Sequence, residues 1–327
     1  MSETRTLNLA LIQHACPPKA DKQANVDKCC ALIRDAAAQG AQLIVTQELF
    51  ASDYFPQTED ETRFDLAEPI PGPTTNRLAQ LASELNVEIS GSIFEKRAPG
   101  LYHNTSVMFD TQGQIVGRYR KMHIPDDPRF YEKYYFTPGD AVSSSRFQVS
   151  SPDGGEAADS QLGTWNLQLE TASSPWQVID TRHARTGLLI CWDQWFPEAA
   201  RLTALRGAEV LLYPTAIGWY HGETPDDQRA QKEAWRTIQR SHAIANGVYV
   251  AAVNRVGTEG DLTFWGSSFV VDPTGTVIAE ASETDEQVLL ATCDLSRIEQ
   301  QRRGWPFLRD RRVDAYAPLT RRLLDEQ

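Results

Sequence analysis

Two pairs of similar segments limit the folds that this chain can adopt. GAQLIVTQ (Gly40–Gln47) resembles GAEVLLYP (Gly207–Pro214), and SVMFDTQGQIV (Ser106–Val116) resembles SFVVDPTGTVI (Ser268–Ile278). Both pairs are separated by nearly the same number of residues, which favours an internal duplication. The alternative is that Gly-Ala strands and Asp-x-x-Gly turns recur by chance, because both are common in α/β proteins.

Strand-like apolar segments alternate with segments of helical periodicity along the chain. The run QLIVT is continuously apolar, as expected for a strand that is covered on both faces. Two sheets that are each covered by helices predict an α/β fold, a four-layer α-β-β-α sandwich of two pseudo-symmetric halves. Strands are predicted over 7–13, 42–46, 87–94, 104–110, 114–120, 187–191, 207–214, 248–254 and 267–272. Helices are predicted over 20–39, 74–85, 197–206 and 228–246.

The 327 residues suffice for one large domain or two ordinary ones, and the repeat favours a single domain over 1–327. Ser143–Pro175 is rich in Ser, Gly, Asp and Glu and is interpreted as an inserted surface loop, with a short hairpin around Leu162–Leu169. A C-terminal tail is expected from about residue 303. Its mixture of arginine and aromatic residues suits an interface or a surface tail.

The composition argues against several classes of function. The formal net charge of -12 disfavours binding to nucleic acid or to an anionic membrane. The five scattered cysteines form no CxxC pair and have no zinc-ligand spacing, which is typical of a reducing cytoplasm. The N-terminal MSETRTLNLALIQ is predicted to be a strand rather than a signal peptide, and no apolar run reaches the length of a membrane span.

Three residues with reactive or charged side chains follow strand-like segments. Glu48 follows QLIVTQ, Lys121 follows QIVGRYR, and Cys191 follows TGLLI. Ligands of open α/β sheets bind beyond the carboxyl ends of the strands, so these side chains are expected to meet in one site. Taken singly, each has an ordinary interpretation. A cysteine at a strand end is usually a small buried hydrophobe, and a glutamate or lysine there is usually solvated.

Together, the three residue types suit nucleophilic attack on a carbonyl or nitrile carbon. A neighbouring cation and a helix N-terminus both lower the pKa of a cysteine thiol. Lys121 is the cation expected near Cys191, and WDQWFPE opens a predicted helix beside it. The ammonium of Lys121 and the backbone N–H of Trp192 can stabilise the negative charge that develops. Glu48 is the candidate proton carrier, because no histidine lies in an equivalent place. This chemistry requires no metal or organic cofactor.

The sequence around these residues resembles the three signature blocks of the nitrilase (carbon–nitrogen hydrolase) superfamily. The blocks are TQELF around Glu48, RKMHIPD around Lys121 and ICWDQWFPEAAR around Cys191, in the order found in the family. The resemblance covers nearly the whole chain apart from Ser143–Pro175. It implies the four-layer sandwich, Glu48 as general base, Lys121 as stabiliser of the tetrahedral intermediate and Cys191 as nucleophile. It also implies a homo-oligomer built from dimers.

A fourth catalytic residue follows from the resemblance alone. The segment EKYYFTPGD resembles the family segment that carries a second glutamate, which places this residue at Glu132. Its expected role is to position Lys121 and the substrate. Two features depart from the family pattern: the insert at 143–175, and the stretch 126–129 (DDPR), where the family has a glycine-containing sequence. The second departure leaves the shape of the pocket there open.

The segments CWDQWFPEAAR, YPTAIGW and RDRR resemble superfamily members that hydrolyse a carbamoylated diamine in polyamine biosynthesis. The expected partner is therefore a small cationic ureido substrate, with no nucleic acid and no membrane. An ammonium group needs anionic or aromatic neighbours. The loop HGETPDDQ offers Glu223, Asp226 and Asp227, and the stretch after Lys121 offers Asp126 and Asp127. The candidate substrate-binding residues are Tyr54, Asp126, Trp192, Trp195 and Thr215.

Other functions stay open at this point. A related amidase would act on N-carbamoyl-β-alanine, an N-carbamoyl amino acid or another small linear amide. Such a carboxylate substrate calls for an arginine clamp, for which Arg129 is a candidate. A true nitrilase is a further alternative, and a non-catalytic binding member of the fold is another. The complete set of Glu48, Lys121 and Cys191 argues against a non-catalytic protein.

Overall fold

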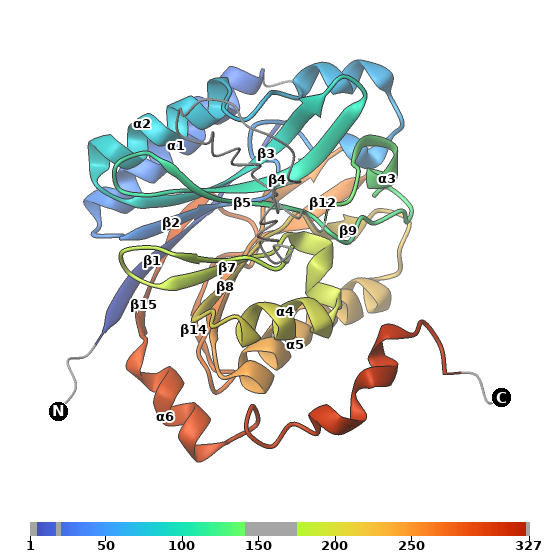
Figure 1. Ribbon diagram of the computed structural model, residues 1–327. Helices are drawn as coiled ribbons and strands as arrows, with labels where there is room; N and C mark the ends of the chain where they lie inside the picture. Colours follow the sequence, from blue (N-terminus) through green and yellow to red (C-terminus); the bar gives the residue numbers. More distant parts are fainter. Residues whose placement is uncertain (1–4, 18–20, 141–174, 325–327) are drawn as a thin grey trace, which may run out of the picture.

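The computed structural model describes residues 5–17, 21–140 and 175–324. The first six-stranded sheet has the order β15-β1-β2-β3-β4-β5, and two helices, α1 and α2, pack on it (Figure 1). Of the predicted insert 143–175, residues 143–174, with the predicted hairpin, lie outside the described residues. The elements of this half are β1 (Thr6–Gln13), α1 (Lys22–Ala38), β2 (Leu43–Thr46), α2 (Pro73–Leu85), β3 (Glu88–Ala98), β4 (Leu101–Phe109), β5 (Ile115–Arg120), α3 (Glu132–Tyr135) and the late strand β15 (Gln287–Asp294).

The second six-stranded sheet has the order β14-β13-β10-β8-β7-β6 and is covered by α4 and α5. A three-stranded sheet, β11-β12-β9, lies beside it. The elements of the second half are β6 (Val178–Asp180), β7 (Arg185–Leu188), α4 (Pro197–Leu205), β8 (Val210–Pro214), β9 (Gly218–Tyr220), α5 (Pro225–Asn246), β10 (Tyr249–Val253), β11 (Val256–Glu259), β12 (Leu262–Trp265), β13 (Phe269–Val271), β14 (Val277–Glu280) and α6 (Ser296–Gly304).

The two large sheets have the same pattern of strand directions, which confirms the predicted pseudo-symmetry. In the first, β1, β2 and β3 are parallel, and β4 and β5 continue antiparallel. In the second, β7, β8 and β10 are parallel, and β13 and β14 continue antiparallel. The GAQLIVTQ and GAEVLLYP segments supply β2 and β8, the second strand of each set.

The repeated hairpins use the same turn chemistry. The carboxylate of Asp110 accepts hydrogen bonds from the backbone N–H groups of Gln112 and Gln114, at 2.9 and 2.8 Å. The carboxylate of Asp272 accepts the equivalent bonds from Thr274 and Thr276, at 2.8 and 3.1 Å. Gly113 and Gly275 adopt φ of 74° and 85°, a region that favours glycine. The Asp-x-x-Gly pattern therefore corresponds to the same hydrogen-bonded turn in both halves.

The main core lies between the two sheets. Alternate residues of β1 point to opposite faces, so Leu7, Leu9 and Leu11 join side chains of β8 and β10, whereas Ala10 and Ile12 pack towards α1 and α2. The layers in order are therefore helices, sheet, sheet and helices, as Figure 1 shows. This confirms the predicted four-layer α-β-β-α sandwich.

The chain beyond α6 continues in short 3-10 turns with mostly exposed side chains, including Val313 and Leu319. In Figure 1 this segment extends along the lower edge of the molecule. No helix among the described residues is long and apolar enough to cross a membrane.

Truncating a side chain between the sheets should cost far more stability than truncating one at the surface. Leu211 is fully buried on β8, so Leu211→Ala should lower the free energy of unfolding by about 2–5 kcal/mol. Val116 on β5 is 41% exposed, and Val116→Ala should change it by less than about 0.5 kcal/mol. Urea denaturation of both variants measures this difference. Equal losses would contradict the placement of the core.

Candidate active site

Three of the four predicted catalytic residues lie just beyond the ends of strands in the two sheets, and the fourth begins a short helix. Glu48 lies two residues after β2, Lys121 directly follows β5, and Cys191 follows the β7 segment. The short helix α3 begins at Glu132. The side chains of Glu48, Lys121 and Glu132 have no solvent exposure, and Cys191 is 4% exposed. The structure therefore brings residues from four distant parts of the chain into one buried region.

A buried ammonium joins two carboxylates at the centre of this region. Lys121 Nζ donates to Glu48 Oε1 at 2.9 Å and to Glu132 Oε2 at 2.6 Å. An ammonium has three protons, so one remains for another acceptor. Cys191 is also among the groups that act on the pKa of Lys121, so its sulfur lies near the ammonium. This places the sulfur, the ammonium and both carboxylates in one electrostatic cluster.

The two carboxylates are held differently. Glu48 Oε1 also accepts a hydrogen bond from Asn104 Nδ2 at 2.7 Å, whereas Glu48 Oε2 has no partner among the described residues. Both oxygens of Glu132 are engaged, because Tyr54 Oη donates to its Oε1 at 2.7 Å. An unpartnered buried carboxylate oxygen is able to accept a proton, so Glu48 has the free acceptor that a general base needs.

The turn that carries Cys191 has an unusual backbone. Cys191 adopts φ of 42°, in the left-handed region that a residue with a side chain rarely occupies. A 3-10 turn spans Cys191–Trp195, and α4 starts only at Pro197. The helix predicted over 197–206 is therefore α4 (Pro197–Leu205), and the 3-10 turn separates its start from Cys191. Such strained positions persist where the surrounding structure holds them in place.

Asp193 anchors this turn to the segment that carries Lys121. Its carboxylate accepts hydrogen bonds from Ile190 N at 2.9 Å and from Tyr119 Oη at 2.7 Å. It also accepts from the backbone N–H of His123 at 3.1 Å, and the His123 ring lies 2.7 Å away through Nδ1. Because Tyr119 and His123 flank Lys121, Asp193 fixes the nucleophile turn relative to the ammonium.

The pKa shifts follow from burial and from one ammonium between two carboxylates. Burial raises the pKa of Glu132 to about 7, and Glu48 adds to this rise while Lys121 opposes it. Burial works to lower the pKa of Lys121, but the charges of Glu132 and Glu48 outweigh it and raise that pKa. The ammonium of Lys121 is therefore charged at neutral pH.

The pKa of Cys191 is raised overall, although Lys121 acts to lower it as expected. Burial and then the charge of Glu48 raise the pKa of the Cys191 thiol well above its ordinary value, and Lys121 opposes this without reversing it. The sequence argument counted the effect of one cation on the thiol, but not the effects of burial and of the two predicted carboxylates, Glu48 and Glu132. The resting nucleophile is therefore a neutral thiol, which needs a base at the moment of attack.

Cys191 opens into a cavity of about 600 Å³. Apolar and aromatic side chains form much of its wall, and Trp192 and Trp195 are among them, as predicted. Phe130 and Tyr220 also line it and were missed. Three carboxylates, those of Asp127, Glu223 and Asp227, line the cavity, and no lysine, arginine or histidine does so among the described residues.

Three predicted substrate-binding residues do not line this cavity within the described chain. Tyr54 is buried and donates to Glu132. The Thr215 hydroxyl is buried and bonds to the backbone carbonyl of Tyr213 at 2.9 Å. Asp126 is exposed and lies 3.9 Å from Lys133, whereas its neighbour Asp127 faces the cavity. Asp226 and Asp227 lie in the first turn of α5, which starts three residues earlier than predicted.

Arg129, the candidate clamp for a substrate carboxylate, is engaged elsewhere. Its guanidinium pairs with Asp261 at 2.7 Å and lies 5.6 Å from the centre of the Tyr220 ring. Arg129 has φ of 70°, a conformation that glycine adopts without strain.

A family model described as carbon–nitrogen hydrolase matches residues 8–303. The chain belongs to the carbon–nitrogen hydrolase family. It is 40% identical to an N-carbamoylputrescine amidase of Solanum lycopersicum, over 97% of this chain and 96% of that protein. It is 39% identical to a citrullinase of Francisella tularensis, over 91% and 93%. A crystal structure of a carbon–nitrogen hydrolase from Helicobacter pylori G27 is 41% identical, with a TM-score of 0.84 over 98% of this chain and all of that one.

Membership of the carbon–nitrogen hydrolase family confirms the resemblance seen in the sequence and makes this chain a hydrolase of non-peptide carbon–nitrogen bonds. Sequence reasoning missed Asn104, Tyr119 and Asp193, whose side chains hold the reactive groups. An asparagine or tyrosine inside a strand carries no signal of its own. Asp193 did carry a sequence signal, because it lies two residues after the predicted nucleophile.

The raised pKa of Cys191 gives a spectroscopic prediction. A thiol remains protonated below its pKa, so the free enzyme should show no thiolate absorbance from Cys191 between about pH 6 and pH 9. Burial also raises the pKa of the other four cysteines, so they contribute little background. The measurement is the ultraviolet difference spectrum between wild type and Cys191→Ala. A thiolate signal that titrates near neutrality would contradict the account.

Proposed function

We propose that this protein hydrolyses N-carbamoylputrescine to putrescine, carbon dioxide and ammonia, a step of polyamine biosynthesis. The observation that carries the proposal is the charge of the cavity at Cys191, which has three carboxylates and no cationic side chain among the described residues. N-carbamoylputrescine has a ureido group at one end, an apolar chain and an ammonium at the other. The similarity to amidases named for this substrate supports the same choice.

Asp127 is the carboxylate best prepared for the substrate ammonium. One of its oxygens is buried and has no hydrogen-bond partner among the described residues. Burial raises the pKa of Asp127, with further contributions from Asp126 and Glu223. A cation at this position would relieve both penalties. Both oxygens of Glu223 already have partners, because Gln231 Nε2 donates to its Oε1 at 2.7 Å and the backbone N–H of Tyr220 donates to its Oε2 at 3.1 Å.

In the proposed mechanism, Glu48 Oε2 takes the proton of Cys191 while the sulfur attacks the ureido carbon. Lys121 and the backbone N–H of Trp192 stabilise the resulting oxyanion. Glu48 then gives its proton to the nitrogen that leaves, and the carbon–nitrogen bond breaks to form a thiol ester of carbamic acid. A water molecule activated by Glu48 hydrolyses this intermediate, which restores the thiol and releases a carbamic acid. The carbamic acid then breaks down to carbon dioxide and the second amine. Glu132 keeps Lys121 oriented throughout.

The alternative substrates differ from N-carbamoylputrescine in the charge that they would bring into the cavity. N-carbamoyl-β-alanine and N-carbamoyl amino acids would bring a carboxylate into a cavity that already holds three, and Arg129 is paired with Asp261 instead of facing it. Citrulline carries an ammonium beside its carboxylate, so the related citrullinase makes it the second candidate. Ammonia release should be fastest with N-carbamoylputrescine, slower with citrulline and slowest with N-carbamoyl-β-alanine. The reverse order would contradict the proposal.

The same proposal predicts which carboxylate matters. Asp127→Asn should raise KM for N-carbamoylputrescine by about 10- to 100-fold, because a charge-assisted hydrogen bond contributes about 1.5–3 kcal/mol. KM for butylurea, which lacks the ammonium, should change little. The matched control is Asp126→Asn, since Asp126 is exposed and lies outside the cavity lining. Equal effects of the two variants, or an equal rise with butylurea, would contradict this role for Asp127.

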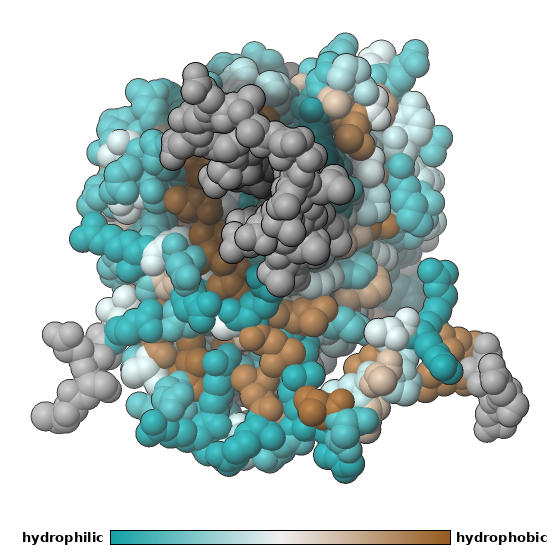
Figure 2. All heavy atoms as spheres, in the orientation of Figure 1, coloured by the Kyte–Doolittle hydropathy of each residue, from teal (hydrophilic) through white to brown (hydrophobic). Residues whose placement is uncertain are grey.

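We also propose that the protein works in the cytoplasm as a homo-oligomer built from dimers. All five cysteines are free, as a reducing compartment requires. Leu202 and Leu205 on α4 are 42% and 44% exposed, and Trp305 is 52% exposed. Figure 2 shows apolar side chains at the surface in the lower half of the view, around α4. Sedimentation equilibrium should give a dimer or a multiple of it, and a monomer at micromolar concentration would contradict the assembly.

A further inference from the structure

We infer that Arg255 and Glu259, a buried ion pair from the second half of the chain, position the general base Glu48 and the Glu132 partner Tyr54. The inference rests on the proposed function, because it assigns both residues to the proton-transfer machinery of that site. Neither residue touches the cavity at Cys191 among the described residues. They are therefore positioning residues rather than catalytic ones.

Arg255 holds the backbone of the turn that carries Glu48. Its guanidinium has no solvent exposure. Nη2 donates to the carbonyl oxygens of Glu48 at 2.8 Å and Leu49 at 3.0 Å, and Nη1 donates to that of Ser52 at 3.3 Å. Leu49 adopts φ of 49°, a left-handed conformation that needs support from its surroundings.

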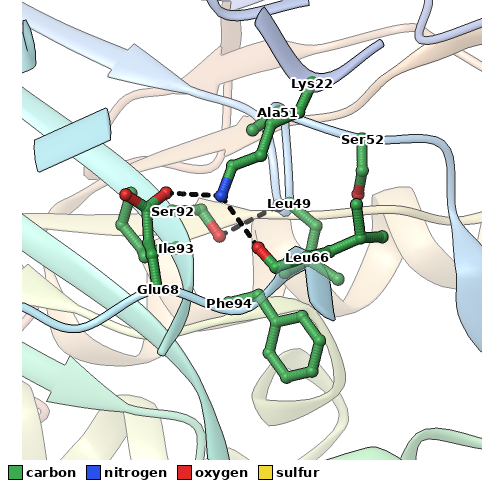
Figure 3. Close-up of a pocket in the computed structure, with 9 residues that line it drawn as sticks. All are labelled: Lys22, Leu49, Ala51, Ser52, Leu66, Glu68, Ser92, Ile93 and Phe94. Carbon is green, nitrogen blue, oxygen red and sulfur yellow. Dashed lines mark hydrogen bonds and ion pairs between the residues drawn. The ribbon is translucent and has the colours of Figure 1, made fainter. Parts of the chain in front are cut away.

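The opposite side of the same turn is held by β3. The backbone N–H of Leu49 donates to Ser92 Oγ at 3.0 Å, at the wall of a small cavity that Figure 3 shows. Lys22 and Glu68 line the same cavity and pair with each other at 2.9 Å. Hydrogen bonds to Leu49 N and to the Glu48 and Leu49 carbonyls thus fix the backbone from two directions. The backbone at Glu48 is therefore fixed, and only the side-chain torsions of Glu48 can still change.

Glu259 extends the support to the other carboxylate. It pairs with Arg255 Nη1 at 2.9 and 3.2 Å through its two oxygens. It also accepts a hydrogen bond from the backbone N–H of Tyr54 at 2.5 Å, and Tyr54 Oη donates to Glu132 at 2.7 Å. One ion pair therefore supports both carboxylates that bind Lys121. It holds Glu48 through the backbone, and it holds Glu132 through the phenol of Tyr54.

The energetics favour positioning over stability as the reason for this pair. Two buried charges gain little net stability, because their desolvation offsets their attraction. A lysine cannot replace the arginine here, since three carbonyls and a carboxylate require the planar fork of donors that only a guanidinium has. The rings of Tyr54 and Phe264 lie 5.9 and 5.3 Å from the Arg255 Cζ and restrict it further.

The test is Arg255→Lys, with activity expressed per reactive site. Substrate-protected alkylation by iodoacetamide counts the competent Cys191 thiols. We expect kcat per counted site to fall by about 10- to 100-fold, since small misplacements of catalytic groups have effects of this size. KM should change by less than about threefold. The matched control is Arg297→Lys, whose arginine pairs with the buried Asp272 at 2.8 Å away from the site. It should lower the melting temperature without changing kcat per site.

A double-mutant cycle adds a measurement that a purely structural role would not alter. Glu48→Asp shortens the side chain of the base and so moves its carboxylate away from the sulfur. If Arg255→Lys already misplaces this carboxylate, Glu48→Asp should lower kcat at least about fivefold less in the Arg255→Lys variant than in the wild type. Unchanged kcat per site, or fully multiplicative effects, would overturn the inference. If Arg255→Lys does not fold, Glu259→Gln replaces it with the same expectations. A wild type that hydrolyses no ureido compound would instead refute the proposed function.

Discussion

The site depends on one buried ammonium that is shared by two carboxylates. Lys121 neutralises only one negative charge, so the group of Lys121, Glu48 and Glu132 keeps an excess negative charge beside Cys191. Burial first, and then the negative charge of Glu48, raises the pKa of the Cys191 thiol, which makes a base necessary in the same step as attack. Removing the ammonium of Lys121 would leave the buried carboxylates without a countercharge, and breaking a buried ion pair in this way costs about 3–5 kcal/mol. Stability and chemistry are therefore coupled at this point of the fold.

The duplicated fold explains how these residues come together. Each half places parallel strands side by side, so their carboxyl ends meet at one edge and the loops that follow them converge. The first half supplies the ammonium and both carboxylates, and the second half supplies the sulfur. Contacts between the halves, from Asp193 to Tyr119 and from Arg255 to Glu48, fix the two sets relative to each other.

The sequence predicted the sandwich and the positions of Glu48, Lys121 and Cys191, because strand ends and turn residues carry local signals. It could not predict which way a side chain points beyond such an end. Tyr54 was expected to face the substrate, but its phenol turns to Glu132. Asp126 was chosen where Asp127 faces the cavity, because a loop has no periodicity to separate neighbours. The raised pKa of Cys191 depends on three chain segments at once, which no local pattern records.

The central claim is that the Cys191 sulfur forms a covalent bond to the substrate carbon while Lys121 and Glu48 act on it. Rapid quenching of the enzyme during turnover of N-carbamoylputrescine, followed by peptide mass spectrometry, tests this directly. The account predicts a carbamoyl or alkylcarbamoyl adduct on the peptide that contains Cys191, with none in the Cys191→Ala protein. Turnover without any adduct under these conditions, or an adduct on a different residue, would contradict it.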